Sequence, residues 1–359
     1  MRGPLTRPTS LRSVSRSVLR PLWMADVGRS PDKTHFAACM EQRPPSPADL
    51  AEFFRTRKVG FDRCLEPLMQ CAETAIRAHS IQNRQTISLL QNDNHVLAWQ
   101  PRFSRAGPEV RLRMVGRNEA STFSGFCSQH DTTLFRPLDT KPLDIADQEQ
   151  LFLLAYRAIT CELHAIMTGV MQLQTLYTAR ADRGVDVADE TSHAGQKAVE
   201  QMLLSWATWR YRFEYYDQPM LSGAHGDVVH EVITFGGQAP CLAASSFITV
   251  KDVPVAENLV GVAINILPVS PSRTVAVFSC ARQHQASVRA ALNRVLGAIG
   301  DTQKYELSKL VLSRISNVLF APAHVAKWRP GKAEKIVAAF VGTVRTQQDV
   351  GDDVDFMLF

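Results

Sequence analysis

The pattern of apolar and polar positions divides the chain into a turn-rich first part, a helical middle and a β-rich last part. Apolar residues recur at helical spacing from about Asp147 to Tyr177, and residues 196–216 repeat the pattern after a polar break. Two long helices are therefore predicted. After residue 221, four runs rich in β-branched residues alternate with Gly, Pro and Ser turns, which predicts an antiparallel sheet. Helical patterns beyond residue 285 and in residues 304–320 predict helices that close this sheet.

The region before residue 147 contains shorter segments. Residues 87–103 alternate around an Asn/Asp turn and predict a hairpin. Residues 126–139 contain a helix start, and we expect this helix to end before Pro137 because the residue preceding a proline disfavours helical backbone. Residues 1–48 are rich in Arg, Ser and Pro, as in a disordered tail, and a short helix is expected at 48–56.

Composition and charge indicate a globular protein but name no partner. The chain has 359 residues, of which 45% are hydrophobic and 21% charged. The net charge of +5 comes from an acid-free start, so the bulk charge gives no support for a polyanionic partner. This charge is carried by Arg2, Arg7, Arg12, Arg16 and Arg20.

Targeting signals are open to more than one interpretation. No apolar run reaches the roughly 18 residues that a membrane span needs, so we expect no membrane contact and a cytoplasmic protein. The Arg/Ser-rich start is typical either of a disordered extension or of an organelle transit peptide.

Four candidate metal ligands occur as two close pairs. Six residues separate Cys64 from Cys71, two separate Cys127 from His130, and 55 lie between the pairs. In a zinc site, each pair lets one turn place two donors, and folding brings the pairs into a tetrahedron with bonds of about 2.0–2.3 Å. Seven cysteines without a secretory signal do not form an obvious disulfide framework. We therefore expect structural Zn²⁺ at these four residues; the alternative is separate buried thiols and a structural histidine.

Two resemblances involve these residues. The blocks AIRAHSIQN, NEASTFSGFCSQHDTTLFRPLD and QLFLLAYRAITCELH resemble, in this order, an uncharacterised family of bacterial proteins, which implies no activity. More distantly, a cysteine pair, then His79, then Cys127, His130 and Asp131 resemble the order of residues in HNH-type treble-clef nucleases. Gln82 stands where those nucleases have proline, and Asp131 stands where they have Asn or His.

The HNH resemblance implies specific catalytic roles. His79 would act as general base on a water molecule, and Asp131 would help to hold a catalytic Mg²⁺ against the scissile phosphate of DNA or RNA. Each residue also has a structural interpretation, because His79 can brace the module and Asp131 can cap a helix. Two functions follow: an HNH-like metal-dependent nuclease, or a non-catalytic binding protein with a structural zinc site and a nucleic acid or protein partner.

Three weaker signals have structural interpretations. His225, Asp227, His230 and Glu231 are close in sequence, but strand geometry would point them to both faces. The aromatic stripe in residues 206–216 contains two arginines and is typical of a helix core, although such residues also stack on bases. Cys161 and His164 lie one helical turn apart without further ligands nearby.

These predictions combine into an α+β fold of four parts. We expect a disordered tail at 1–48, a small zinc-binding treble-clef-like module with an inserted hairpin at 49–146, long helices at 147–220, and an antiparallel sheet with C-terminal helices at 221–359.

Overall fold

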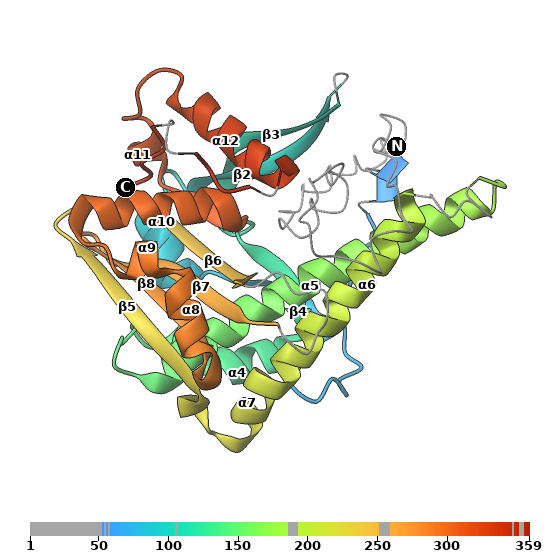
Figure 1. Ribbon diagram of the computed structural model, residues 1–359. Helices are drawn as coiled ribbons and strands as arrows, with labels where there is room; N and C mark the ends of the chain where they lie inside the picture. Colours follow the sequence, from blue (N-terminus) through green and yellow to red (C-terminus); the bar gives the residue numbers. More distant parts are fainter. Residues whose placement is uncertain are drawn as a thin grey trace, which may run out of the picture.

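A computed structural model describes residues 52–53, 55–56, 58–104, 107–185, 193–250, 259–346, 348–351 and 355–359. The predicted α+β class is confirmed, because helices pack on antiparallel sheets (Figure 1). The predicted tail at 1–48 and the beginning of the predicted helix at 48–56 lie outside the described residues.

The larger sheet has seven strands in the order β3-β2-β9-β6-β7-β8-β5, and every neighbouring pair is antiparallel. The four β-rich runs predicted after residue 221 all form strands of this sheet. Its members are β2 (His95–Ser104), β3 (Gly107–Gly116), β5 (Val228–Gly236), β6 (Leu242–Thr249), β7 (Gly261–Ser270), β8 (Arg273–Ala281) and β9 (Val318–Phe320).

A second sheet consists of β1 (Ile76–His79) and β4 (Thr122–Phe126), which pair antiparallel. The hairpin β2–β3 is inserted between them in sequence, yet β2 pairs with β9 of the larger sheet. The predicted hairpin at 87–103 is wrong in its first arm, because Asn83–Ile87 (η2) and Ser88–Leu90 (α3) are helical. Ile87 and Leu90 are both buried there. Residues three positions apart lie on the same side of a helix but on opposite faces of a strand, so the helical backbone directs both side chains into the core.

The helical middle follows the predicted pattern with shifted ends. The long pair is α5 (Gln148–Ala181) and α6 (His193–Arg212); α6 continues through a π-helical turn η3 (Phe213–Asp217) into α7 (Gln218–Ser222). Helix α5 is long and apolar enough to cross a membrane, but 72% of its most apolar window is buried inside the protein, as in a core helix.

Helix α4 (Ser128–Thr140) corrects one prediction, because it continues through Pro137 instead of ending before it. Gln150 of α5 donates its amide to the carbonyls of Pro137 and Pro142, at 3.1 and 3.2 Å. Tertiary contacts with α5 thus support the last turn of α4, where the local preference favours a break.

The C-terminal helices cover one face of the sheet. They are α8 (Gln285–Ala291), α9 (Asn293–Leu296), α10 (Gly300–Arg314), α11 (Pro322–Val325) and α12 (Lys332–Thr346); two 3₁₀ turns, η4 (His225–Asp227) and η6 (Arg282–His284), flank strands β5 and β8. The predicted helix at 304–320 ends at Arg314, and its last residues form β9.

Alternation along the strands produces two cores on opposite faces of the sheet. Ala243 and Phe247 belong to the core that contains Phe152 and Tyr156 of α5. Even-numbered neighbours join the other core, under α10 and α12. Because side chains alternate across a strand, β6 and β7 are apolar on both faces and form the buried centre of the molecule.

Candidate metal centre

The four predicted ligands meet at one point. Every pair of their donor atoms lies within 4.8 Å. The Cys71 and Cys127 sulfurs are 3.9 Å apart, and Nδ1 of His130 lies 3.2 Å from the Cys127 sulfur and 3.4 Å from that of Cys64. Donor atoms this close can hold a metal ion. This is the only such cluster among the residues that the structure describes.

The six residues between Cys64 and Cys71 form a tight loop, here called the knuckle loop, around the carboxylate of Glu66. One carboxylate oxygen accepts from the amide of Leu68 at 2.8 Å, and the other accepts from Cys71 at 3.1 Å and from Gln70. Glu66 is nearly fully buried, so these bonds satisfy a charge that burial would otherwise penalise. The wide spacing of the first ligand pair thus has a specific internal support.

The second ligand pair occupies the first turn of α4. Cys127 is the N-cap residue, and His130 follows in the first turn, so the helix start aims both donors the same way. The amide of Leu65 donates to Gly125 at 2.7 Å, and the amide of Cys127 donates to the Cys64 sulfur at 3.3 Å. These bonds fasten the knuckle loop to the end of β4 and the start of α4.

The thiols of the cluster differ in acidity. Burial raises the pKa of Cys64 to about 12, although backbone amides of Cys127 and Glu66 oppose the rise. Burial also opposes ionisation of Cys127, but hydrogen bonds from the backbone and imidazole of His130 outweigh it and lower the pKa of Cys127 to about 7. Cys127, at a helix N-terminus, therefore loses its proton more readily than Cys64.

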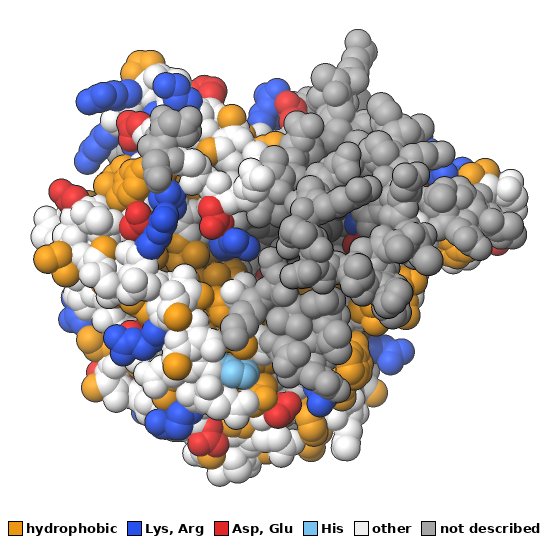
Figure 2. Space-filling view, viewed as in Figure 1, with side chains coloured by type: hydrophobic (Ala, Val, Ile, Leu, Met, Phe, Trp, Pro, Cys, Tyr) orange, Lys and Arg blue, Asp and Glu red, His pale blue; other side chains and the backbone are white. Residues whose placement is uncertain are grey.

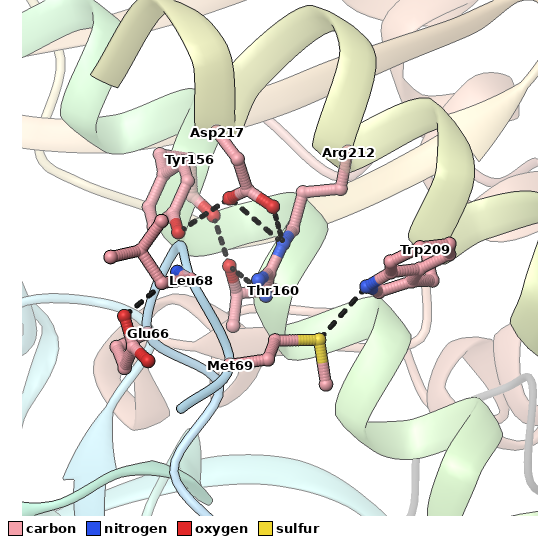
Figure 3. A network of polar contacts seen from close by, with 8 residues as sticks. All are labelled: Glu66, Leu68, Met69, Tyr156, Thr160, Trp209, Arg212 and Asp217. Carbon is pink, nitrogen blue, oxygen red and sulfur yellow. Dashed lines mark hydrogen bonds and ion pairs between the residues drawn. The ribbon is translucent and has the colours of Figure 1, made fainter. Parts of the chain in front are cut away.

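The knuckle loop also rests on the long helices (Figure 3). Trp209 of α6 donates its indole N–H to the Met69 sulfur at 2.8 Å. Near this contact, Arg212 and Asp217 form a fully buried ion pair at 3.2 Å, and the Tyr156 hydroxyl donates to Asp217 at 2.8 Å. The ion pair spans the π-helical turn, so the helix irregularity places both charges against α5.

His79 lies at the end of β1, and its ring is anchored. Its Nε2 is 3.1 Å from the carbonyl oxygen of Arg117. Because a carbonyl only accepts, the neutral ring carries its proton on Nε2, which leaves the lone pair on Nδ1. Burial lowers the pKa of His79, an effect that the Arg117 carbonyl opposes, so the ring is neutral near pH 7.

Asp131 follows His130 in the first turn of α4 and is not the helix cap, since that position belongs to Cys127. Burial raises the pKa of Asp131, and the Arg157 guanidinium opposes this rise. Arg157 lies 4.0 Å above the Phe135 ring and forms a two-point ion pair with Asp139 at 3.0 and 3.3 Å.

The same Arg157–Asp139 pair acts electrostatically on both His79 and Asp131. On α4, Asp131, Phe135 and Asp139 follow at intervals of four residues and share one face. The same ion pair therefore influences His79, opposite Thr122 on β4, and Asp131, next to the ligand His130.

The other histidine and cysteine candidates from the sequence make contacts within the protein core or to backbone groups and do not form a further site. His225 stacks on Phe152 at 4.7 Å, and Nδ1 of His230 bonds Ser279 at 2.8 Å, so the motif does not converge. Cys161 is near Ser80, and His164 bonds the carbonyl of Phe61 at 2.9 Å.

The aromatic stripe of α6 departs from the expected core position. Trp206 and Phe213 are 49% and 42% exposed, while Tyr216 is buried. Arginine accompanies this exposed part, since Arg210 lies 5.7 Å from the Trp206 ring. On the face viewed in Figure 2, however, described basic and acidic side chains are interspersed, without a broad surface of one sign.

No family model, curated protein or solved structure matches this chain. The two resemblances stay predictions, as do the division into four parts, the cytoplasmic location and the absence of membrane contact. The sequence pattern did not indicate the supporting residues: Glu66 in the knuckle loop, Arg117 at the His79 ring, and the Arg157–Asp139 pair. A glutamate between two candidate ligands was the only sequence signal for any of them.

Proposed function

We propose that Cys64, Cys71, Cys127 and His130 bind one zinc ion. A tetrahedral site with zinc bonds of 2.0–2.3 Å has edges of about 3.8 Å between two sulfurs and about 3.6 Å between sulfur and nitrogen. The distances of 3.9, 3.4 and 3.2 Å are close to these edges. Three thiolates and an imidazole are also a donor set that suits zinc over hard cations such as Mg²⁺.

The zinc would have a structural role in a treble-clef-like module. The order supports this: a knuckle loop supplies two ligands, an antiparallel strand pair follows, and the first turn of a helix supplies the other two. All four positions are filled by protein side chains, which is typical of structural zinc. The ion would connect the knuckle loop to α4. Four metal–ligand bonds would make this connection stronger than a backbone hydrogen bond.

Metal content of the purified protein tests this proposal. We expect one zinc per chain in the wild type, and loss of zinc in Cys127→Ser. The matched control is Cys241→Ser, because Cys241 is also buried but lies outside the cluster. Wild-type protein prepared without chelators that contains no zinc, or equal zinc in both variants, would contradict the proposal.

We further propose, on a separate observation, that the module is an HNH-like nuclease centre acting on DNA or RNA. That observation is the anchored, neutral His79, whose Nδ1 lone pair suits a general base; the Arg157–Asp139 pair acts on both His79 and Asp131. Mg²⁺ would supply stabilisation of charge on the phosphate. His79 would accept the proton of the attacking water at Nδ1, and the Asp131 carboxylate would face the metal.

A cleavage assay separates this candidate from a non-catalytic binding protein. Zinc-loaded wild type should cut plasmid DNA or RNA with Mg²⁺, and His79→Ala should lower the rate about 100-fold or more, the usual contribution of a general base. His95→Ala is the matched control, since His95 is exposed and lies on β2. If zinc-loaded wild type cuts neither substrate, the nuclease is excluded and the zinc-binding proposal stands.

A further inference from the structure

A turn at residues 117–121, here called the clamp turn, contacts the ring of His79. Its first residue, Arg117, supplies the carbonyl that bonds Nε2 of His79. Its last residue, Ser121, faces Ser80, the neighbour of His79. Any shift of the clamp turn would therefore move the carbonyl to which the His79 ring is bonded.

Ser121 has an unusual backbone for a buried residue. Its φ is 58°, and it is only 3% exposed. This left-handed conformation is strained for a residue other than glycine, and such strain persists only where surrounding contacts impose it. Here the contacts are clear: the Ser121 hydroxyl accepts from the amide of Ile81 at 3.2 Å, and its carbonyl accepts from the amide of Ser80 at 2.8 Å.

The far end of the chain secures these contacts. Asn317, just before β9, donates its side-chain amide to the Ser80 hydroxyl at 2.8 Å and to the carbonyl of Ser245 on β6 at 3.0 Å. The Ser80 hydroxyl in turn donates to the Ser121 carbonyl at 3.0 Å. One side chain thus links the central sheet to the two serines at the base of the clamp turn, across 237 positions of sequence.

We propose that Asn317 and Ser121 are positioning residues for His79. They hold the clamp turn where the Arg117 carbonyl keeps the imidazole proton on Nε2, so that Nδ1 stays available as the base. Asn317 does this through Ser80, and Ser121 through its strained backbone and its hydroxyl. The inference rests on the proposed nuclease for its catalytic meaning, but the ring position itself can be measured without catalysis.

The first readout is the tautomer of His79, from ¹⁵N NMR of the imidazole with His79→Ala for assignment. Wild type should show a neutral ring with its proton on Nε2. Asn317→Ala should show a mixture of tautomers, and so should Ser121→Gly, which keeps the left-handed backbone but removes the hydroxyl. The control is Gln172→Ala, which removes another buried long-range bond, the one from Gln172 to the carbonyl of Val59.

Zinc content must remain one per chain in each variant, which shows that the metal cluster has formed. If Asn317→Ala and Ser121→Gly keep zinc and keep a single Nε2–H tautomer, the positioning role is wrong. A mixture in Gln172→Ala as well would also overturn it, because the effect would then be general loosening.

The second readout is the rate of cleavage. Asn317→Ala should lower kcat about tenfold with KM unchanged, because substrate binding is intact while the base is misoriented. Wild type without cleavage would reject the nuclease and leave the tautomer result to decide the positioning role. Cleavage that His79→Ala abolishes but Asn317→Ala leaves unchanged would reject the positioning role alone.

Discussion

The buried Arg212–Asp217 pair offers a sharp test of how the two long helices are joined. Both side chains are fully buried, and Asp217 also accepts from the Tyr156 hydroxyl. Removing one partner of a buried pair leaves an uncompensated charge, which costs about 3–5 kcal/mol. Arg212→Met should therefore lower the free energy of unfolding by about 3–5 kcal/mol. Asp217→Leu should cost about 1–2 kcal/mol more, because Tyr156 also loses its acceptor.

The double variant should be less damaging than the sum of the two. With both charges gone, mainly the unpaired Tyr156 hydroxyl remains, so a loss of about 1–3 kcal/mol is expected. The coupling energy is then about 4 kcal/mol or more, a large part of the 5–15 kcal/mol that stabilises ordinary proteins.

Urea unfolding, followed by far-UV circular dichroism at saturating zinc, measures these values. The control is Arg314→Met, whose partner Asp349 is 61% exposed, and which should change stability by at most about 1 kcal/mol. Additive losses in the double variant, or single losses no larger than that of the control, would refute the claim that this pair acts as one buried unit.

Two further predictions concern the knuckle loop and acid stability. Glu66→Gln should weaken zinc binding about tenfold, because the glutamine side chain has one acceptor oxygen for three backbone donors of the knuckle loop. Competition with a chromogenic chelator measures the affinity, and Glu73→Gln, at an exposed site, is the control that should bind zinc as the wild type does. Equal zinc affinities of Glu66→Gln and the wild type would contradict the supporting role of Glu66. Burial lowers the pKa of His230 to about 4, from 6.5 in the unfolded chain, so its stabilising contribution is complete above pH 6.5 and is lost as the pH falls from 6.5 to about 4. His230→Gln should flatten the fall in stability over that range by about 1–3 kcal/mol in urea titrations, and an unchanged slope would contradict the assignment.

Local sequence patterns accounted for much of the architecture. Apolar spacing of 3.6 residues predicted the long helices, and runs rich in β-branched residues between Gly, Pro and Ser turns predicted the strands from β5 to β8, because both signals depend only on near neighbours in the sequence. The paired spacing of Cys64 with Cys71, and of Cys127 with His130, likewise predicted the cluster that could hold a metal. Periodicity and ligand spacing belong to a single segment and do not depend on how the rest of the chain folds.

Only the tertiary structure decided how distant segments meet. Pairing of β2 with β9, continuation of α4 through Pro137 and exposure of Trp206 all depend on surfaces supplied from elsewhere. The same holds for the ring of His79, which is anchored by a carbonyl 38 positions away, and for its neighbour Ser80, which Asn317 contacts across 237 positions. The sequence by itself determined which residues can ligate, pack or ionise. Folding decided which of them face one another, because a hydrogen bond across hundreds of residues leaves no periodic trace in the segments it joins.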